Sequence, residues 1–194
     1  MRPTPKMALL ALAITLFVTQ GIVSQVTSES PEQFVGRYLE MSKTDAVGTV
    51  KLMHPEALLS FKTLLTPLFE VKPPTVGTEI LSVKNADAYA ALSPEEVYVR
   101  FISYIYRTSP GFGATIGASE MKVLGGVTEG ELVHVLYRMK VRIADVSVDK
   151  VEIITVKKNG SGWAAMLSGD YEGLVDAIVK RPVGQPPTPK RKRT

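Results

Sequence analysis

The spacing of hydrophobic residues along the chain changes once, near Ser119. Before this point, apolar residues recur every three or four positions, as they do on one face of a helix. After it, apolar and polar residues alternate, as in a strand that buries one face. Helices followed by hairpin-linked strands predict an α+β domain, in which N-terminal helices pack on a curved antiparallel sheet of about four strands.

Three helices are predicted by their start signals. Ser30-Pro31-Glu32-Gln33 and Ser93-Pro94-Glu95-Glu96 each place a serine cap before a proline, with a capping-box partner three residues on. His54-Pro55-Glu56 begins another helix, which Pro67 should end or kink. Thr44-Asp45 predicts a weaker helix, because Gly48 and β-branched neighbours follow it.

The segments between these helices predict less regular structure. Glu70–Thr78 contains two consecutive prolines and a glycine, so we expect a loop. Glu79–Leu92 suggests a short extended piece and a turn of helix. Ser109-Pro110-Gly111 should stop the preceding helix, and the glycine-rich Gly111–Gly117 predicts a flexible loop at a rim or lid. Its glycine spacing is too wide for a dinucleotide-binding fingerprint.

The alternating part of the chain predicts an antiparallel sheet, because its connections are too short for crossovers. The expected strands are Glu120–Val127, Glu131–Ile143, Lys150–Lys158 and Trp163–Leu167. Gly125-Gly126 suggests a bulge or bend, and Asn159-Gly160 suits a tight hairpin. A short helix is expected after Asp170.

One sheet face is predicted to cover the helices and the other to face outward. Val133, Val135, Tyr137, Met139, Val141 and Ile143 share the apolar face of the longest strand. We expect an exposed apolar patch on the opposite face, through which the protein would form a homodimer. The residues assigned to this patch are Leu132, Leu136, Ile154 and Val156.

The first residues read as an export signal. Arg2 and Lys6 precede the apolar run Met7–Val18, and small or polar residues follow as far as Ser24. The run is about half the roughly 20 apolar residues that a spanning helix needs, which favours a cleaved signal peptide over a retained anchor. We therefore expect a signal peptide over 1–24, with Gly21 as an alternative cleavage point, and a periplasmic or secreted protein.

Composition limits the function classes. The chain has no cysteine, which excludes disulfides and thiolate chemistry. Of its 23 basic residues, Arg2 and Lys6 lie in the signal and four lie in Lys190–Arg193, which leaves 17 against 19 acidic residues. A nearly neutral body argues against specific nucleic-acid binding. We expect one domain over 25–181 and a disordered Pro-rich basic tail over 182–194, which is a candidate contact for an anionic envelope component.

The order and spacing of these elements resemble the nuclear-transport-factor-two-like superfamily, also called cystatin-like α+β. The resemblance spans roughly Ser30–Ile178 and rests on Met53-His54-Pro55-Glu56-Ala57-Leu58, the strand Val133–Arg138 and the Gly162-Trp163 return. It implies a cone of helices and curved sheet, often with an apolar pocket. Such folds serve isomerases, dehydratases and ligand binders, so the resemblance assigns no catalytic residue here.

Candidate chemistry is sparse. His54 and His134 are the only histidines and lack metal-ligand spacing, so we expect no metal, no cofactor and no assigned catalytic residue. Aromatic residues are the best material for a ligand site, with core packing as the alternative role. The residues we select are Tyr104, Tyr137 and Trp163.

These observations predict an exported, noncatalytic module that binds a partner protein or a small apolar ligand. The alternative is an isomerase- or dehydratase-like enzyme that uses a pocket carboxylate and a tyrosine. Asp145, Asp149 and Asp170 are the candidate bases. A carboxylate beside Tyr137 or Trp163 within a cavity would favour the enzyme, and a filled cone would leave a structural or interaction role.

Overall fold

A computed structural model describes residues 29–70, 74–143, 146–169, 171 and 173. The expected signal peptide, the basic tail and all but two residues of the expected C-terminal helix lie outside the described residues. Across the part that is described, no helix is both long and apolar enough to cross a membrane.

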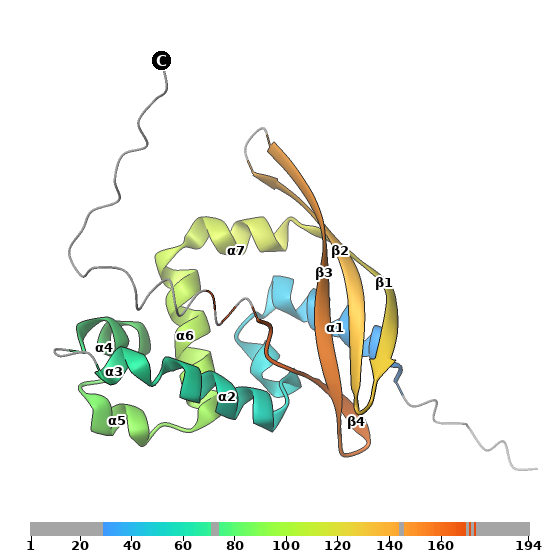
Figure 1. Ribbon diagram of the computed structural model, residues 1–194. Helices are drawn as coiled ribbons and strands as arrows, with labels where there is room; N and C mark the ends of the chain where they lie inside the picture. Colours follow the sequence, from blue (N-terminus) through green and yellow to red (C-terminus); the bar gives the residue numbers. More distant parts are fainter. Residues whose placement is uncertain (1–28, 71–73, 144–145, 170, 172, 174–194) are drawn as a thin grey trace, which may run out of the picture.

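The protein has an α+β fold, as the hydrophobic pattern predicts (Figure 1). The helices are α1 (Pro31–Thr44), the 3-10 helix η1 (Gly48–Leu52), α2 (Pro55–Leu65), α3 (Pro67–Glu70), α4 (Thr75–Leu81), α5 (Ala86–Ala90), α6 (Pro94–Thr108) and α7 (Pro110–Gly117). The strands are β1 (Glu120–Glu129), β2 (Leu132–Ile143), β3 (Val146–Asn159) and β4 (Gly162–Ala165). They form one open antiparallel sheet in the order β1-β2-β3-β4.

The predicted helix starts are confirmed. Ser30 and Gln33 form a reciprocal capping box, in which the Gln33 N–H donates to Ser30 Oγ at 3.2 Å and the Ser30 N–H donates to Gln33 Oε1 at 2.9 Å. Ser93 and Glu96 repeat this arrangement at the start of α6. At α2 the imidazole Nδ1 of His54 accepts from the Glu56 N–H at 3.2 Å. Each cap satisfies a backbone donor that the first helical turn leaves unpaired.

Several expectations for the connecting segments are wrong. The weak helix expected from Thr44-Asp45 is replaced by η1, which begins at Gly48. Asp45 Oδ1 accepts a hydrogen bond from the Gly48 N–H at 2.9 Å. The extended piece expected within 79–92 is absent, because α4 and α5 occupy most of it. Ser82 ends α4 with a left-handed φ of 52°, and Asn85 Oδ1 caps α5. The loop expected over 70–78 is interrupted, since α4 begins at Thr75.

The glycine-rich segment expected to be a flexible loop is helix α7. Pro110 stands in its first turn, where proline is tolerated, so it begins a helix as well as ending α6. Glycine at 113 allows a close approach to α6, because a Cβ there would lie 2.9 Å from Cδ1 of the Tyr106 ring. Gly113 therefore serves the packing of α7 against α6.

The sheet follows the predicted strands, with changes at their ends. The register between β1 and β2 shifts at Val123/Gly125, which confirms the bulge, and Gly125 has a φ of 149°. Gly160 adopts a φ of 60° in the β3–β4 turn. β3 begins at Val146, earlier than expected, because it stays paired with β2 up to Ile143↔Val146. β4 ends at Ala165, earlier than expected.

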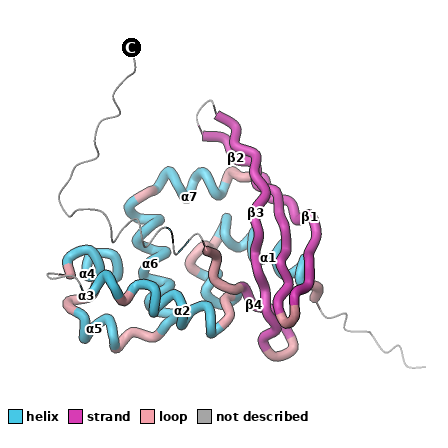
Figure 2. Tube along the Cα trace, viewed as in Figure 1, coloured by secondary structure: helices cyan, strands magenta, loops and turns pink. Residues whose placement is uncertain are grey.

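The core lies between the inner face of the sheet and the helices. Val135 and Val156 on the sheet and Phe34 and Val35 on α1 are completely buried. Figure 2 shows the helices gathered on one side of the four strands, with α1 running behind them in this view. This packing corrects one expectation: Ile154 and Val156 lie on the inner face, because they pair with Val135 and Val133.

Candidate functional site

A pocket of about 380 Å³ lies between α1, β3 and the chain that follows β4. The Met166 N–H donates to the Thr155 carbonyl at 2.8 Å, and the chain then turns away from β3 toward the helices (Figure 1). The gap left beside β3 is the pocket. Its apolar and aromatic lining residues are Tyr38, Met53, Val151, Ile153, Ile154, Ala165, Met166, Leu167 and Tyr171.

Phenol groups gather at the inner end of this pocket. Tyr38 is surrounded by Tyr98, Tyr137 and Tyr171, and burial together with these neighbours raises its pKa well above the ordinary value of 10.0. Its hydroxyl donates a hydrogen bond to the Met53 sulfur at 3.9 Å. The Tyr38 phenol therefore stays neutral at physiological pH and can donate a hydrogen bond to a ligand.

Glu152 is the one acidic residue among the described residues that line this pocket. It pairs with Tyr137 across β2 and β3, on the inner face of the sheet. Its carboxylate forms an ion pair with the Lys150 ammonium, and its side chain is 28% exposed. A carboxylate thus lies beside Tyr137 at the pocket, which is the arrangement that the enzyme alternative requires.

The three aromatic residues selected from the sequence lie at separate places. Tyr137 is half-buried on β2 next to Glu152, and Tyr104 lies on α6 with the Arg107 guanidinium 5.8 Å from its ring centre. Neither Tyr104, Tyr137 nor Trp163 is a lining residue of the pocket beside β3. A ligand-binding role for them stays a prediction.

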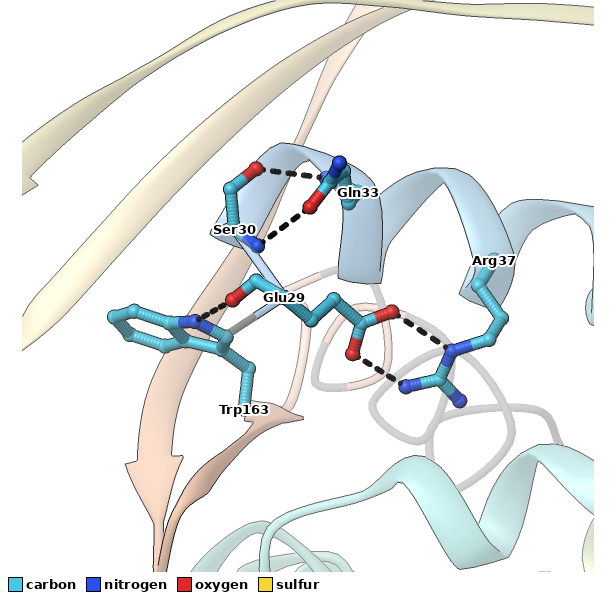
Figure 3. Close-up of polar contacts among 5 residues, drawn as sticks. All are labelled: Glu29, Ser30, Gln33, Arg37 and Trp163. Atoms are coloured by element: carbon cyan, nitrogen blue, oxygen red, sulfur yellow. Dashed lines mark hydrogen bonds and ion pairs between the residues drawn. The ribbon is translucent and has the colours of Figure 1, made fainter. Parts of the chain in front are cut away.

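Trp163 instead joins β4 to the beginning of α1 (Figure 3). Its indole N–H donates to the Glu29 carbonyl at 3.0 Å, and the Lys158 ammonium lies 4.0 Å from its ring centre. The Glu29 carboxylate accepts two hydrogen bonds from Arg37, at 2.9 and 2.8 Å. These hydrogen bonds from Arg37 lower the Glu29 pKa from 4.5. We call Glu29, Ser30, Gln33, Arg37 and Trp163 the α1 anchor.

A second, shallower hollow of about 580 Å³ lies beside the β1–β2 turn. Its polar groups are already paired. His134 lies between Thr155 Oγ1 at 2.9 Å and Glu129 Oε2 at 3.1 Å, and the Lys157 ammonium donates to both Glu56 oxygens. The hydrogen bonds from Lys157 lower the Glu56 pKa and raise that of Lys157. Within the described ranges, no group of three or more His, Cys, Asp or Glu side chains could hold a metal ion.

Of the candidate bases, only Asp149 falls within the described residues. It pairs with Lys140, and its carboxylate lies 3.6 Å from Arg138 Nε on the outer face of the sheet, away from the pocket. Asp145 and Asp170 lie outside the described residues. Sequence reasoning missed Glu152, although its position opposite Tyr137 follows from the β2–β3 register.

The outer face carries exposed apolar side chains, but none of them is one of the four residues expected there. Leu132 and Leu136 do lie on this face and are half-buried. Leu124, Val127, Val151 and Ile153 are 47 to 61% exposed. Self-association through this face stays a prediction.

Comparisons with family models, with curated proteins and with solved structures found no match to this chain. Membership of the nuclear-transport-factor-two-like superfamily is therefore a proposal that rests on the order of elements alone.

Proposed function

We propose that the protein is an exported, noncatalytic module that binds a small apolar ligand in the pocket beside β3. The observation that carries this proposal is the lining, in which methionine, leucine and isoleucine walls surround a buried tyrosine hydroxyl. Ligand pockets typically combine apolar walls with a few polar groups that fix orientation. The volume of about 380 Å³ lies within the range of small-molecule pockets.

The expected ligand is a small, mainly apolar molecule with one hydrogen-bond acceptor. The acceptor atom of the ligand would accept a hydrogen bond from the Tyr38 hydroxyl. Met53, Met166 and Leu167 would contact the apolar part of the ligand. Methionine side chains adapt their shape to different ligands, because their thioether chains are flexible and polarisable. The pocket is therefore suited to a class of apolar ligands.

A fluorescent probe tests this proposal. N-phenyl-1-naphthylamine is neutral and apolar, and we expect it to bind the wild-type chain with enhanced emission. Leu167→Trp places a larger side chain at the wall and should weaken binding at least about tenfold, equivalent to about 1.4 kcal/mol. Val127→Trp adds the same side chain on the exposed outer face and should leave binding unchanged.

Glu152 supports a second candidate function, an isomerase that moves a proton within a carbonyl compound. The carboxylate would take a proton from a carbon next to the carbonyl and return it to another carbon, so that no co-reactant is consumed. The Lys150 ammonium forms an ion pair with this carboxylate. Conversion of cyclohex-3-enone to cyclohex-2-enone, lost in Glu152→Gln with probe binding retained, would support the enzyme. No conversion by the wild-type chain would oppose it.

A further inference from the structure

Part of β3 forms an edge of the sheet that has no strand partner among the described residues. β4 pairs with β3 only from Val156 to Asn159, whereas β3 begins at Val146. The Met166 N–H extends the contact by one residue, to the Thr155 carbonyl. The backbone groups of β3 before Thr155 that point away from β2 therefore form an open edge, which we call the β3 edge.

The direction of these groups follows from the Thr155 contact. Both backbone groups of a residue in an antiparallel strand point to the same side, and residues two apart share that side. Since the Thr155 carbonyl points toward Met166, the N–H and C=O groups of Asp149, Val151 and Ile153 point to the open edge. The side chains of Val151 and Ile153 point to the outer face of the sheet, where they are 47% and 54% exposed.

Native proteins usually protect such an edge with a charge that repels a second strand. At the β3 edge the charge of Lys150 is balanced by Glu152, which lies on the same face, carries the opposite charge and forms an ion pair with it. An antiparallel second copy centred on Val151 places Lys150 opposite Glu152 of that copy, twice by symmetry. Opposite charges placed directly across two strands stabilise their pairing.

The charges also fix the register. Moving the two-fold centre by one residue places Lys150 opposite Lys150, or Glu152 opposite Glu152, and both arrangements are repulsive. The centre at Val151 instead pairs Val151 with itself and brings Val148 opposite Ile154. Val151 then exchanges backbone hydrogen bonds with its copy, because its N–H and C=O both point to the edge.

We propose that two copies of this chain associate through the β3 edge, in antiparallel register centred on Val151, to form a continuous sheet. The paired segment runs from Asp149 to Ile153 of each copy, since Met166 occupies the edge at Thr155. Val151 and Ile153 also line the pocket beside β3, so the paired strand closes this side of the pocket. A two-fold axis makes this interface self-complementary. The pairing uses backbone groups at the sheet edge, whereas the side chains of Val151 and Ile153 lie on the outer face.

Two single charge reversals test this inference on the full chain. Glu152→Lys places lysine opposite lysine in the dimer, and Lys150→Glu places glutamate opposite glutamate. We expect each variant alone to dimerise at least about tenfold more weakly than the wild-type chain in sedimentation velocity, because both symmetric pairs become repulsive.

Mixing the two variants supplies the matched control. A chain with two lysines faces a chain with two glutamates, so every cross-strand pair is attractive and a heterodimer should form at wild-type concentrations. The double variant Lys150→Glu/Glu152→Lys restores the complementarity within one chain and should dimerise like the wild type. Circular dichroism of each single variant checks that its sheet content is unchanged.

Other outcomes overturn the proposal. A wild-type chain that is monomeric at all accessible concentrations contradicts it, as does a mixture of single variants that stays monomeric while both are folded. Val127→Lys introduces a charge on the outer face at β1, two strands away from β3, and should leave the dimer intact. If Val127→Lys abolishes the dimer and the charge reversals do not, the outer face is the interface.

Discussion

The two halves of β3 differ in what covers them. From Val156 to Asn159 the strand is paired with β4, and Val156 and Lys157 are also paired with β2. Val156 is completely buried, and the indole of Trp163 on β4 donates a hydrogen bond to Glu29 at the start of α1. Before Thr155, β2 is the one paired strand among the described residues, this part of β3 borders the pocket, and Ile153 is 54% exposed. The covered half contributes stability, whereas the open half offers surface for binding.

The largest expected effect is a loss of stability caused by a substitution next to the covered half of β3. Trp163→Ala removes the indole packing and the hydrogen bond to Glu29, and we expect a loss of about 3 kcal/mol in the free energy of unfolding. Trp163→Phe keeps an aromatic ring and should lose only about 1 kcal/mol. Val151→Ala in the open half should change stability by less than about 0.5 kcal/mol. Urea unfolding measures all three, and equal losses at Trp163 and Val151 would contradict the comparison.

The next effect concerns the cap within the α1 anchor. Ser30→Ala removes the acceptor for the Gln33 N–H, so we expect a loss of about 1 kcal/mol. Ser147→Ala, in the open half of β3, is the matched control and should have almost no effect. Thermal unfolding of the two variants checks the difference, and an unchanged melting temperature for Ser30→Ala would show that the cap adds nothing.

A smaller effect is expected with pH. Arg37 lowers the folded-state pKa of Glu29, so this contribution to stability is complete above the ordinary value of 4.5 and is lost as the pH falls toward the folded pKa. Glu29→Gln should therefore be less stable than the wild type at neutral pH, with the difference shrinking under acid conditions. A difference that stays constant across this pH range would contradict the role of the ion pair.

The smallest effect lies outside both halves. Deletion of Pro186–Thr194 removes the basic tail and should weaken binding to vesicles containing an anionic lipid, most clearly at low salt. Probe binding in the pocket should be unaffected. Equal vesicle binding by the full and shortened chains would contradict a role of the basic tail in binding anionic lipid.

Local signals in the sequence predicted much of the fold. The Ser30 and Ser93 capping boxes and the Gly125 bulge depend on neighbouring residues, so their positions could be predicted. Helix α7 could not be predicted in this way, because Gly113 makes a close approach to Tyr106, a contact between two helices. Local composition alone suggested a loop.

The candidate site depended on longer-range information. Ile154 and Val156 were assigned to the wrong face because strand alternation does not fix which face is buried, and pairing with Val135 and Val133 does. Tyr38 follows the apolar spacing of α1 and could not be distinguished from a core residue. Its place in the pocket results from the path of the chain after β4, which no local pattern specifies.

The most direct test of the central claim is mass spectrometry of the native protein, in parallel with the Leu167→Trp variant purified identically. We predict that the wild-type chain releases a small apolar molecule on denaturation, at up to one per chain, and that the variant releases much less. Equal amounts from both proteins, together with no binding of N-phenyl-1-naphthylamine by the wild type, would contradict a ligand-binding pocket beside β3.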